Sequence, residues 1–262
     1  DTTPELDEEG PFDAGNFICE DVSDDRNKFL RQELKTKLLV TSATVDRGFG
    51  ATPQSRARLE VEELVSKLEG LSPIADATRG LVGSGSEFDA DSCPLAGTWK
   101  LVFTTAYDVL SLNANPVLTL EGIFQDITPS GISRNIIDLA PRVQVLFPFV
   151  PPTTFRAVVR TEARARSPAR VGLTFKAAEI GPLEVLGKEA TELPRIGGNF
   201  PDISVFGANI GASSGATSDG PGYFDVVYLD HDMLIIRQNE PGGIFVSTRV
   251  TRDENRIEEI NV

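Results

Sequence analysis

The residue best suited to acid–base or metal chemistry is the single histidine, His231, which stands between Asp230 and Asp232. An imidazole between two carboxylates could bind a metal or act as a general base. No second histidine, cysteine nucleophile or glycine-rich phosphate loop accompanies it in the sequence. We therefore interpret Asp230 and Asp232 as turn-forming and hydrogen-bonding residues, and we predict no catalytic site, no metal site and no enzymatic activity.

Stretches of alternating residues predict strands that each have one apolar face. The period of two begins at 98–104 and recurs at 154–164 and 170–177, as half-buried strands require. A barrel of roughly eight such strands is wide enough to hold either side chains or one small ligand. The residues predicted to line an apolar pocket are Trp99, Leu101, Phe103, Phe155, Val159, Leu173 and Phe175. The alternative is that they fill a solid core.

Arginines occupy the opposite face of two of these predicted strands. Because alternate residues of a strand project to opposite faces, five arginines should share one surface, which Glu162 interrupts. This predicted basic face consists of Arg156, Arg160, Arg164, Arg166 and Arg170. It could bind anionic lipid headgroups, at about 1 kcal/mol per charge, or an acidic protein surface. The alternatives are a solvated face or pairing with the acidic N-terminal segment.

The segment Val145–Pro152 (VLFPFVPP) is apolar and bounded by prolines. If it is exposed, it would form a hydrophobic wedge for membrane insertion beside the basic face. If it is buried, it is the end of a core strand, which is the commoner arrangement of such residues.

The elements that must position these residues fall into three regions. Residues 27–41 and 52–70 have helical periodicity, with leucines on one stripe. Residues 72–94 are rich in Gly, Pro, Ser and Asp and are predicted to be a linker. Further strands are predicted at 121–127, 131–139, 223–229, 232–238 and 243–250. The sequence thus predicts a mainly β (α+β) chain: an acidic extended tail at 1–25, a helical lead-in and linker at 26–94, and an antiparallel barrel at 95–262 with a long loop at 207–222.

Charge is distributed unevenly along the 262 residues. The formal net charge is −14, yet residues 1–25 hold ten acidic residues and no Lys or Arg. The other 237 residues hold 29 acidic and 25 basic residues, a net charge of −4. Since no basic cluster adjoins aromatic residues, we predict no nucleic-acid partner.

Other features of the sequence bear on its compartment. Cys19 and Cys93 are too few for a disulfide framework and have no metal-ligand spacing, so we predict two free thiols, with a single bridge as the alternative. No apolar run reaches the roughly 20 residues of a spanning helix. Because the sequence starts at Asp1 rather than at Met, we expect that a targeting segment has been removed.

Three separated segments resemble the plastid lipid-associated proteins, also called plastid fibrillins. They are LLVTSATVDRGFGATPQSRARLEVEELVSKLEGLSP (Leu38–Pro73), LAGTWKLVFTT (Leu95–Thr105) and DVVYLDHDMLIIRQNEPGGIFVSTR (Asp225–Arg249). The second contains the Gly-X-Trp element that begins lipocalin barrels, with Trp99 as the residue that plugs one end. In lipocalins a late arginine packs over that ring through a cation–π contact, and the resemblance offers Arg249 and Arg237 as the barrel-closing candidates.

The resemblance implies a lipocalin-like barrel and a peripheral protein of the plastid, at the thylakoid membrane or the plastoglobule. It implies a structural or binding role with no obligatory cofactor, the candidate guests being lipid, carotenoid, quinone or chlorophyll. One alternative is an accessory subunit of a photosystem or antenna complex, and another is a barrel enzyme that acts on a lipophilic substrate. The chain departs from the family at Gln238-Asn239, in the insertion at 207–222 and in its acidic tail, so no particular ligand can be carried over.

Overall fold

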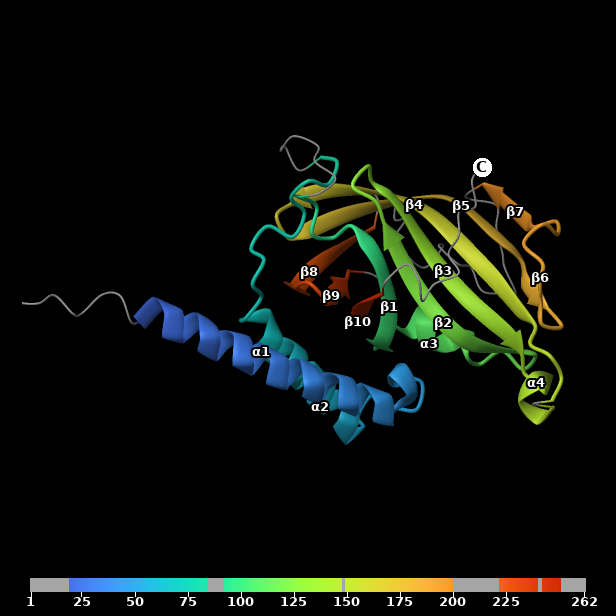
Figure 1. Ribbon diagram of the computed structural model, residues 1–262, viewed down its shortest axis with the longest axis horizontal. Coiled ribbons are helices and arrows are strands. Elements are labelled where there is room, and N and C mark those ends of the chain that lie inside the picture. Colours follow the sequence, from blue (N-terminus) through green and yellow to red (C-terminus); the bar gives the residue numbers. More distant parts are fainter. Residues whose placement is uncertain (1–18, 84–91, 148, 200–221, 240–241, 251–262) are drawn as a thin grey trace, which may run out of the picture.

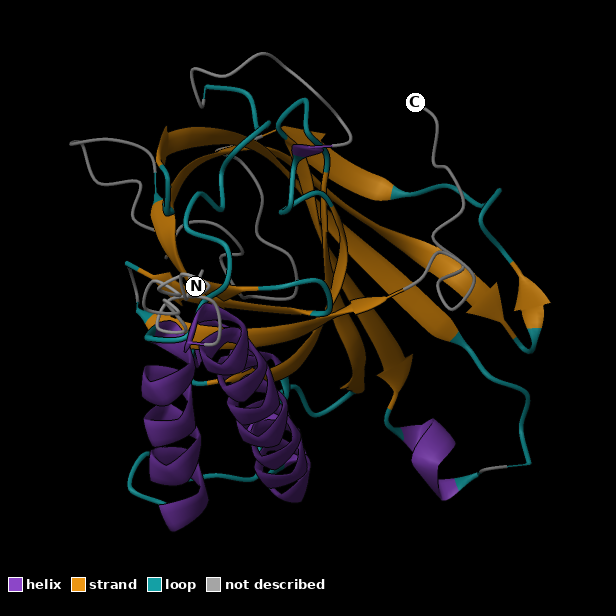
Figure 2. Cartoon of the chain, turned by 60° about the vertical axis from the view of Figure 1, so that its left-hand side comes forward, coloured by secondary structure: helices purple, strands orange, loops and turns teal. Residues whose placement is uncertain are grey.

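The computed structural model describes residues 19–83, 92–147, 149–199, 222–239 and 242–250. Two helices, α1 (Cys19–Thr44) and α2 (Arg56–Glu69), lie side by side on the outside of a β-barrel (Figures 1 and 2). A short 3-10 turn, η1 (Asp46–Gly48), follows α1. The predicted pair of helices in front of an antiparallel barrel is confirmed.

Both helices differ in detail from the prediction. Since α1 begins at Cys19, the last seven residues of the predicted extended tail are helical; residues 1–18 lie outside the described residues. Acidic residues are favourable near the positive end of a helix, and Glu20 and Asp21 stand there in the sequence. The N-cap of α2 is Ser55, whose hydroxyl accepts a hydrogen bond from the Arg58 N–H. Leu59 of α2 is exposed, outside the buried stripe of the helix.

Eight strands close the barrel, and each overlaps a predicted strand. The neighbour order is β4-β3-β2-β1-β10-β9-β8-β5, and β5 pairs with β4 to complete the ring. The strands are β1 (Gly97–Thr104), β2 (Leu118–Ile127), β3 (Ile132–Pro141), β4 (Thr154–Ser167), β5 (Arg170–Val185), β8 (Tyr223–Leu229), β9 (Met233–Gln238) and β10 (Gly243–Val250). All neighbours in the ring are antiparallel.

Four smaller elements were not predicted. They are α3 (Tyr107–Leu112), α4 (Val143–Leu146), β6 (Lys188–Glu189) and β7 (Ile196–Asn199). The last two both pair with β5. The predicted loop at 207–222 lies outside the described residues, except for Gly222.

The barrel wall beneath the helices is buried on both faces. On its outer face, residues of α1 and α2 pack against β1, β8, β9 and β10. This helix-covered cluster includes Leu38, Val61, Leu64, Leu68, Phe103, Tyr228, Met233, Ile235 and Val246. On its inner face, Leu234 and Ile236 of β9 point into the barrel. Because both faces are buried, strands in this part of the wall, such as β9, have near-continuous apolar runs rather than clean alternation.

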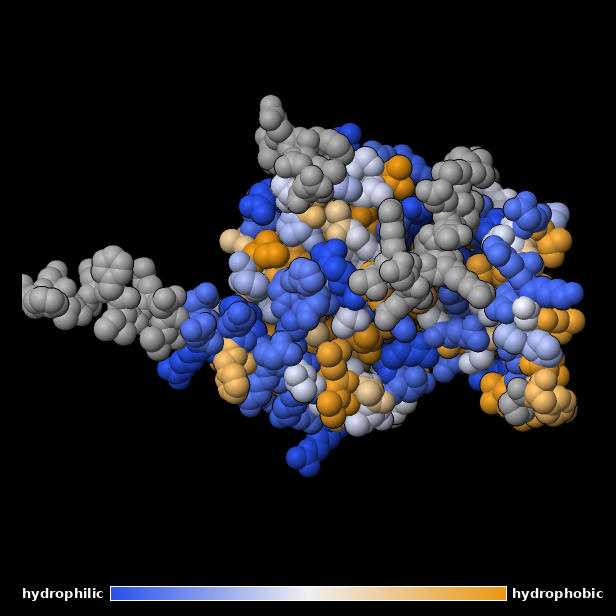
Figure 3. All heavy atoms as spheres, in the orientation of Figure 1, coloured by the Kyte–Doolittle hydropathy of each residue, from blue (hydrophilic) through white to orange (hydrophobic). Residues whose placement is uncertain are grey.

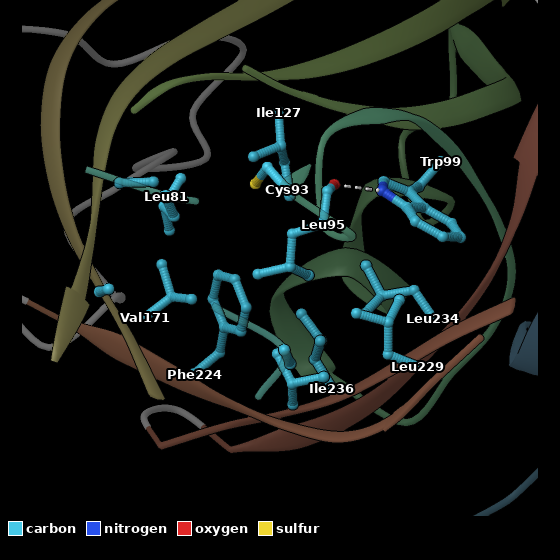
Figure 4. Packing of buried hydrophobic residues seen from close by; sticks show 14 residues of the cluster. Leu81, Cys93, Leu95, Trp99, Ile127, Val171, Phe224, Leu229, Leu234 and Ile236 are labelled. Carbon is cyan, nitrogen blue, oxygen red and sulfur yellow. Dashed lines mark hydrogen bonds between the residues drawn. The ribbon is translucent and has the colours of Figure 1, made fainter. Parts of the chain in front are cut away.

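The prediction of a linker at 72–94 is wrong for the residues that the structure describes. This segment enters one end of the barrel, where Ala77, Leu81, Cys93 and the following Leu95 are buried in the cluster that contains Trp99 (Figure 4). The backbone N–H of Ala77 donates to the Pro168 carbonyl, which fastens this segment to the β4–β5 turn. The barrel is thus plugged by its own chain at this end, called the Trp99 end below.

Candidate functional site

The opposite end of the barrel carries a cluster of exposed apolar side chains. β3 ends at Pro141, and the chain then forms α4 and returns to β4 at Thr154. Within this connection Val145, Leu146 and Phe149 are 71%, 74% and 80% exposed. The Phe147 and Phe149 rings contact each other edge to face, with centroids 5.9 Å apart. The described residues of the predicted wedge at 145–152 are therefore on the surface (Figure 3, lower right), and Pro148 lies outside the described residues.

This connection is fixed to the barrel although its side chains are exposed. The Gln144 side chain accepts a hydrogen bond from the Thr153 N–H at 3.0 Å. The Gly187 N–H of the β5–β6 turn donates to the Pro152 carbonyl, and Leu186 beside it is also exposed. We call the exposed set the apolar tip: Val143, Val145, Leu146, Phe147, Phe149, Val150 and Leu186.

The inner face of the barrel at the tip end is apolar. A cluster there, called the Leu139 cluster, contains Leu118, Leu120, Ile137, Leu139 and Ala157. Phe49, next to η1, and Leu112 of α3 pack against it from the rim, and Ile123, Phe155 and Ile180 pack against it from the wall. Phe49, Ile123, Phe155 and Ile180 are only partly buried, while the five residues of the Leu139 cluster itself are buried. The Leu139 cluster is thus a second group of buried apolar residues inside the barrel, bordered by side chains that keep some exposure.

The structure places six of the seven predicted pocket residues on the inner face. Trp99 lies in the plugged end with Leu173 packed against it. Leu101 and Val159 are buried, while Phe155 and Phe175 are partly buried. Whether this inner face holds a guest stays a prediction.

The predicted inward direction of Phe103 is wrong. The register of β1 with β10 shifts between Leu101 and Phe103, because Val102 is an extra residue in β1. A bulge of this kind reverses which face the next residues occupy. Phe103 consequently lies on the outer face, buried beneath α1 and α2.

The predicted basic face is largely neutralised by acidic neighbours. Arg156 is buried rather than exposed, and its guanidinium donates to both oxygens of Asp138 at 2.7 and 2.8 Å. Arg160 pairs with Glu179, Arg164 with Glu162 and Arg170 with Asp225. Arg166 is exposed and packs over Gly172.

The arginines at the far end of β4 are not adjacent to the apolar tip, contrary to the prediction, and Arg156, which is near the tip, is buried. The tip precedes Thr154, at the start of β4, whereas Arg164 and Arg166 lie at the end of this 14-residue strand. A strand of that length spans about 40 Å. These arginines therefore stand near the Trp99 end, far from the tip.

Arg249 is the candidate that lies over Trp99. Its guanidinium carbon is 4.1 Å from the centre of a Trp99 ring. The same group donates to the carbonyls of Ala96, Pro94 and His231 at 2.6, 2.8 and 2.7 Å. Arg237 instead pairs with Glu69 of α2 on the outer face. Arg249 thus holds together the plug, the first strand and the β8–β9 turn.

The acidic turn around His231 anchors α1. The Lys35 ammonium of α1 donates to the carboxylates of Asp230 and Asp232, and the Tyr228 hydroxyl also donates to Asp230. One Asp230 oxygen accepts the N–H groups of Asp232 and Met233, as a turn-forming aspartate does. His231 is exposed, and its carbonyl accepts a hydrogen bond from the Arg249 guanidinium. Among the described residues, no group of three or more His, Cys, Asp or Glu could hold a metal ion.

Two further observations concern the cysteines and the helices. Cys93 is a free thiol in the Trp99 cluster, and burial raises its pKa. The Cys19 side chain lies outside the described residues. Of the helices in the described ranges, none is long and apolar enough to cross a membrane.

Sequence reasoning missed the polar residues of the inner face. Gln125, Asn135 and Ser133 share this face with Trp99, as the strand register shows. The signal that could have found them is the alternation itself: Gln125 stands two residues from both Ile123 and Ile127, and Ser133 and Asn135 precede Ile137 at alternate positions.

Comparison with known proteins gives a consistent set of relatives. The PAP_fibrillin family model matches residues 32–247. The chain is 28% identical to Plastoglobulin-1, chloroplastic, of Pisum sativum over 248 residues, which cover 82% of this chain and 60% of that protein. It is 29% identical to Plastid lipid-associated protein 3, chloroplastic, of Brassica campestris over 242 residues, covering 83% and 60%.

A third relative is named for a pigment. The chain is 31% identical to Chromoplast-specific carotenoid-associated protein C2, chromoplastic, of an Oncidium hybrid cultivar over 183 residues, covering 69% of this chain and 49% of that protein. The chain therefore spans at most about three fifths of the length of these three curated relatives. No solved structure matches the chain.

Proposed function

Because the chain belongs to the PAP_fibrillin family, we propose that it is a non-catalytic protein of the plastid that attaches peripherally to a lipid surface. The apolar tip is the part that enters the lipid, and the barrel behind it holds an apolar molecule. The names of the chloroplastic and chromoplastic relatives, which refer to plastoglobules, lipids and carotenoids, support the compartment and the class of surface.

The observation that carries this proposal is the exposed apolar tip. Isolated apolar residues are common on protein surfaces, but a contiguous exposed cluster marks an interaction site. Transfer of one exposed Leu or Phe side chain from water to an apolar phase is worth about 1.5–3 kcal/mol. Leu146 and Phe149, both more than 70% exposed, can therefore supply most of the affinity for a lipid surface.

The position of the tip links the surface to the barrel. The tip leaves β3 directly after Leu139 and returns to β4 directly before Phe155, and both residues face the barrel interior. A molecule in the lipid phase beneath the tip therefore lies next to the apolar rim of the barrel. We infer that guests such as lipid, carotenoid, chlorophyll or quinone enter from this end, since the Trp99 end is plugged.

The arginines do not favour a second membrane-binding face. Arg160, Arg164 and Arg170 each have an acidic partner, so attraction to anionic headgroups adds little. We therefore expect the lipid surface to be recognised by its exposed acyl chains, as at a thylakoid membrane or a plastoglobule. None of the three relatives is named as a subunit of a photosystem or antenna complex, and that alternative stays a prediction.

Flotation with lipid droplets tests this proposal. The double variant Leu146→Ser/Phe149→Ser should bind phosphatidylcholine-coated triacylglycerol droplets at least about tenfold more weakly than the wild type, because each tenfold in affinity is worth about 1.4 kcal/mol. Ile132→Ser is the matched control, since Ile132 is 55% exposed at the start of β3, at the Trp99 end.

The control should leave flotation unchanged. Equal flotation of the tip variant and the wild type would contradict the proposal, as would an equal loss in the Ile132→Ser control.

A further inference from the structure

A row of paired residues crosses the inner face of the barrel between its two apolar clusters. Trp99 of β1 pairs with Gln125 of β2, which pairs with Asn135 of β3, which pairs with Val159 of β4. Residues that pair directly across antiparallel strands project to the same face. Gln125 and Asn135 therefore place two side-chain amides side by side on the inner face, next to Trp99.

Alternation along β2 and β3 also places Gln125 and Asn135 on the inner face. Gln125 alternates with Ile123 of the Leu139 cluster and Ile127 of the Trp99 cluster. Asn135 alternates with Ser133 and Ile137, and Ile137 belongs to the Leu139 cluster. The amides thus form a polar band on the inner face between the Trp99 cluster and the Leu139 cluster.

The polar groups of this band lack partners in the part of the chain that the structure describes. Neither the Gln125 nor the Asn135 side chain makes a hydrogen bond there, and both residues are only partly buried. The Ser133 hydroxyl is fully buried and also has no partner. A buried hydroxyl without a hydrogen bond is costly, and such groups in an apolar surround fix the orientation of a ligand.

We propose that this polar band binds the uncharged head of an amphipathic guest through hydrogen bonds. Each amide offers both donors and an acceptor, and the serine hydroxyl offers both roles. They suit a carbonyl or hydroxyl oxygen, and the apolar body of the guest would lie along Ile123, Phe155 and Ile180 toward the tip. This inference deepens the proposed function and rests on its claim that the barrel holds a guest.

The charge of the surrounding wall selects against ionised heads. Among the described inward residues of β2, β3 and β4, none is Lys, Arg, Asp or Glu. Arg249 faces the same interior, but its three carbonyl hydrogen bonds and its stacking on Trp99 commit it to the plug. A carboxylate or phosphate here would be desolvated without a counter-ion, which is strongly unfavourable.

The test compares two ligands that differ in the head alone. Decyl-para-benzoquinone carries two carbonyl oxygens, and decylbenzene has a ring and tail of similar shape without them. Binding is measured by competition against a lipophilic fluorophore and, for the quinone, by quenching of Trp99, the single tryptophan of the chain. Since decylbenzene is the more apolar ligand, burial of apolar area alone would favour it.

The wild type should bind the quinone at least about tenfold more tightly than decylbenzene, the effect of one or two hydrogen bonds. The double variant Gln125→Met/Asn135→Leu should lose this preference and keep its affinity for decylbenzene. Gln54→Met, at an exposed surface amide, should behave as the wild type. Should the double variant fail to fold, Ser133→Ala serves in its place and should lower the preference at least about twofold.

The outcomes separate this inference from the proposed function. If the wild type binds both ligands equally, or the variants keep the quinone preference, the polar band does not recognise the head and the inference is overturned, while the barrel remains a container for apolar guests. If the wild type binds neither ligand, the claim that the barrel holds a guest fails, and the inference fails with it.

Discussion

Asp230 illustrates how a single carboxylate can join a helix to a barrel. Its side chain is 15% exposed and receives the Lys35 ammonium, the Tyr228 hydroxyl and two backbone N–H groups. Burial disfavours the charged form, but the hydrogen bonds to Asp232, Lys35 and Tyr228 outweigh it and lower the pKa of Asp230 to about 2. Burial, together with the same carboxylate, raises the pKa of Tyr228.

Protonation of Asp230 should lower the stability of the protein at acidic pH. An aspartate in an unfolded chain has a pKa of about 3.9, so the stabilisation is complete above about pH 5 and is lost as the pH falls toward 2. The free energy of unfolding of the wild type should fall over this range by about 1–2 kcal/mol more than that of Asp230→Asn, allowing for solvent screening. Urea unfolding followed by Trp99 fluorescence measures the difference. Parallel curves for the two proteins would show that Asp230 does not titrate as described.

At the scale of elements, η1 is the most constrained connection. Asp46, Arg47 and Gly48 all have positive φ, at 44°, 58° and 102°, a region that residues other than glycine avoid. The Arg47 guanidinium offsets part of this cost by donating to the carbonyls of Leu120 and Glu121, where β2 bulges. The strained turn thereby holds Phe49 against the rim of the barrel.

Gly48 should be the least replaceable glycine of the α1–α2 region. A Cβ at Gly48 would lie 2.2 Å from the Thr104 carbonyl oxygen, whereas at Gly70 its nearest neighbour would be 3.8 Å away. Gly48→Ala should lower the free energy of unfolding by about 3 kcal/mol or more, while Gly70→Ala should change it by less than about 1 kcal/mol. Chemical denaturation of the two variants checks this. A Gly48→Ala protein as stable as Gly70→Ala would contradict the described conformation of η1.

The elements also show how far sequence reasoning reaches. Local residue patterns predicted the eight barrel strands, because each strand has at least one face that must be apolar. They placed Phe103 on the wrong face, because a bulge such as that at Val102 has no signature in the local pattern. They treated residues 72–94 as a linker, because composition does not reveal that Leu81 and Leu95 fill a barrel end. The exposure of the apolar tip and the pairing of Arg156 with Asp138 are tertiary facts, which local patterns do not contain.

At the scale of the whole molecule, the two ends of the barrel differ in structure. The Trp99 end is sealed by residues 74–95 and by Arg249, while the far end presents an apolar rim and the exposed tip. Helices α1 and α2 cover the outer wall of the barrel and do not enter its interior (Figure 2). Under the proposed attachment through the tip, this polarity would give the protein one orientation on a lipid surface, with the tip in the lipid and the plugged end in water.

Depth-dependent fluorescence quenching measures this orientation directly. Phe149→Trp at the tip and Ile132→Trp at the plugged end are each mixed with phosphatidylcholine vesicles whose acyl chains carry bromine, and the emission of Trp99 in the wild type is subtracted. We predict strong quenching of Phe149→Trp and none of Ile132→Trp. Quenching of Ile132→Trp, or an unquenched Phe149→Trp in protein bound to the vesicles, would contradict attachment through the tip.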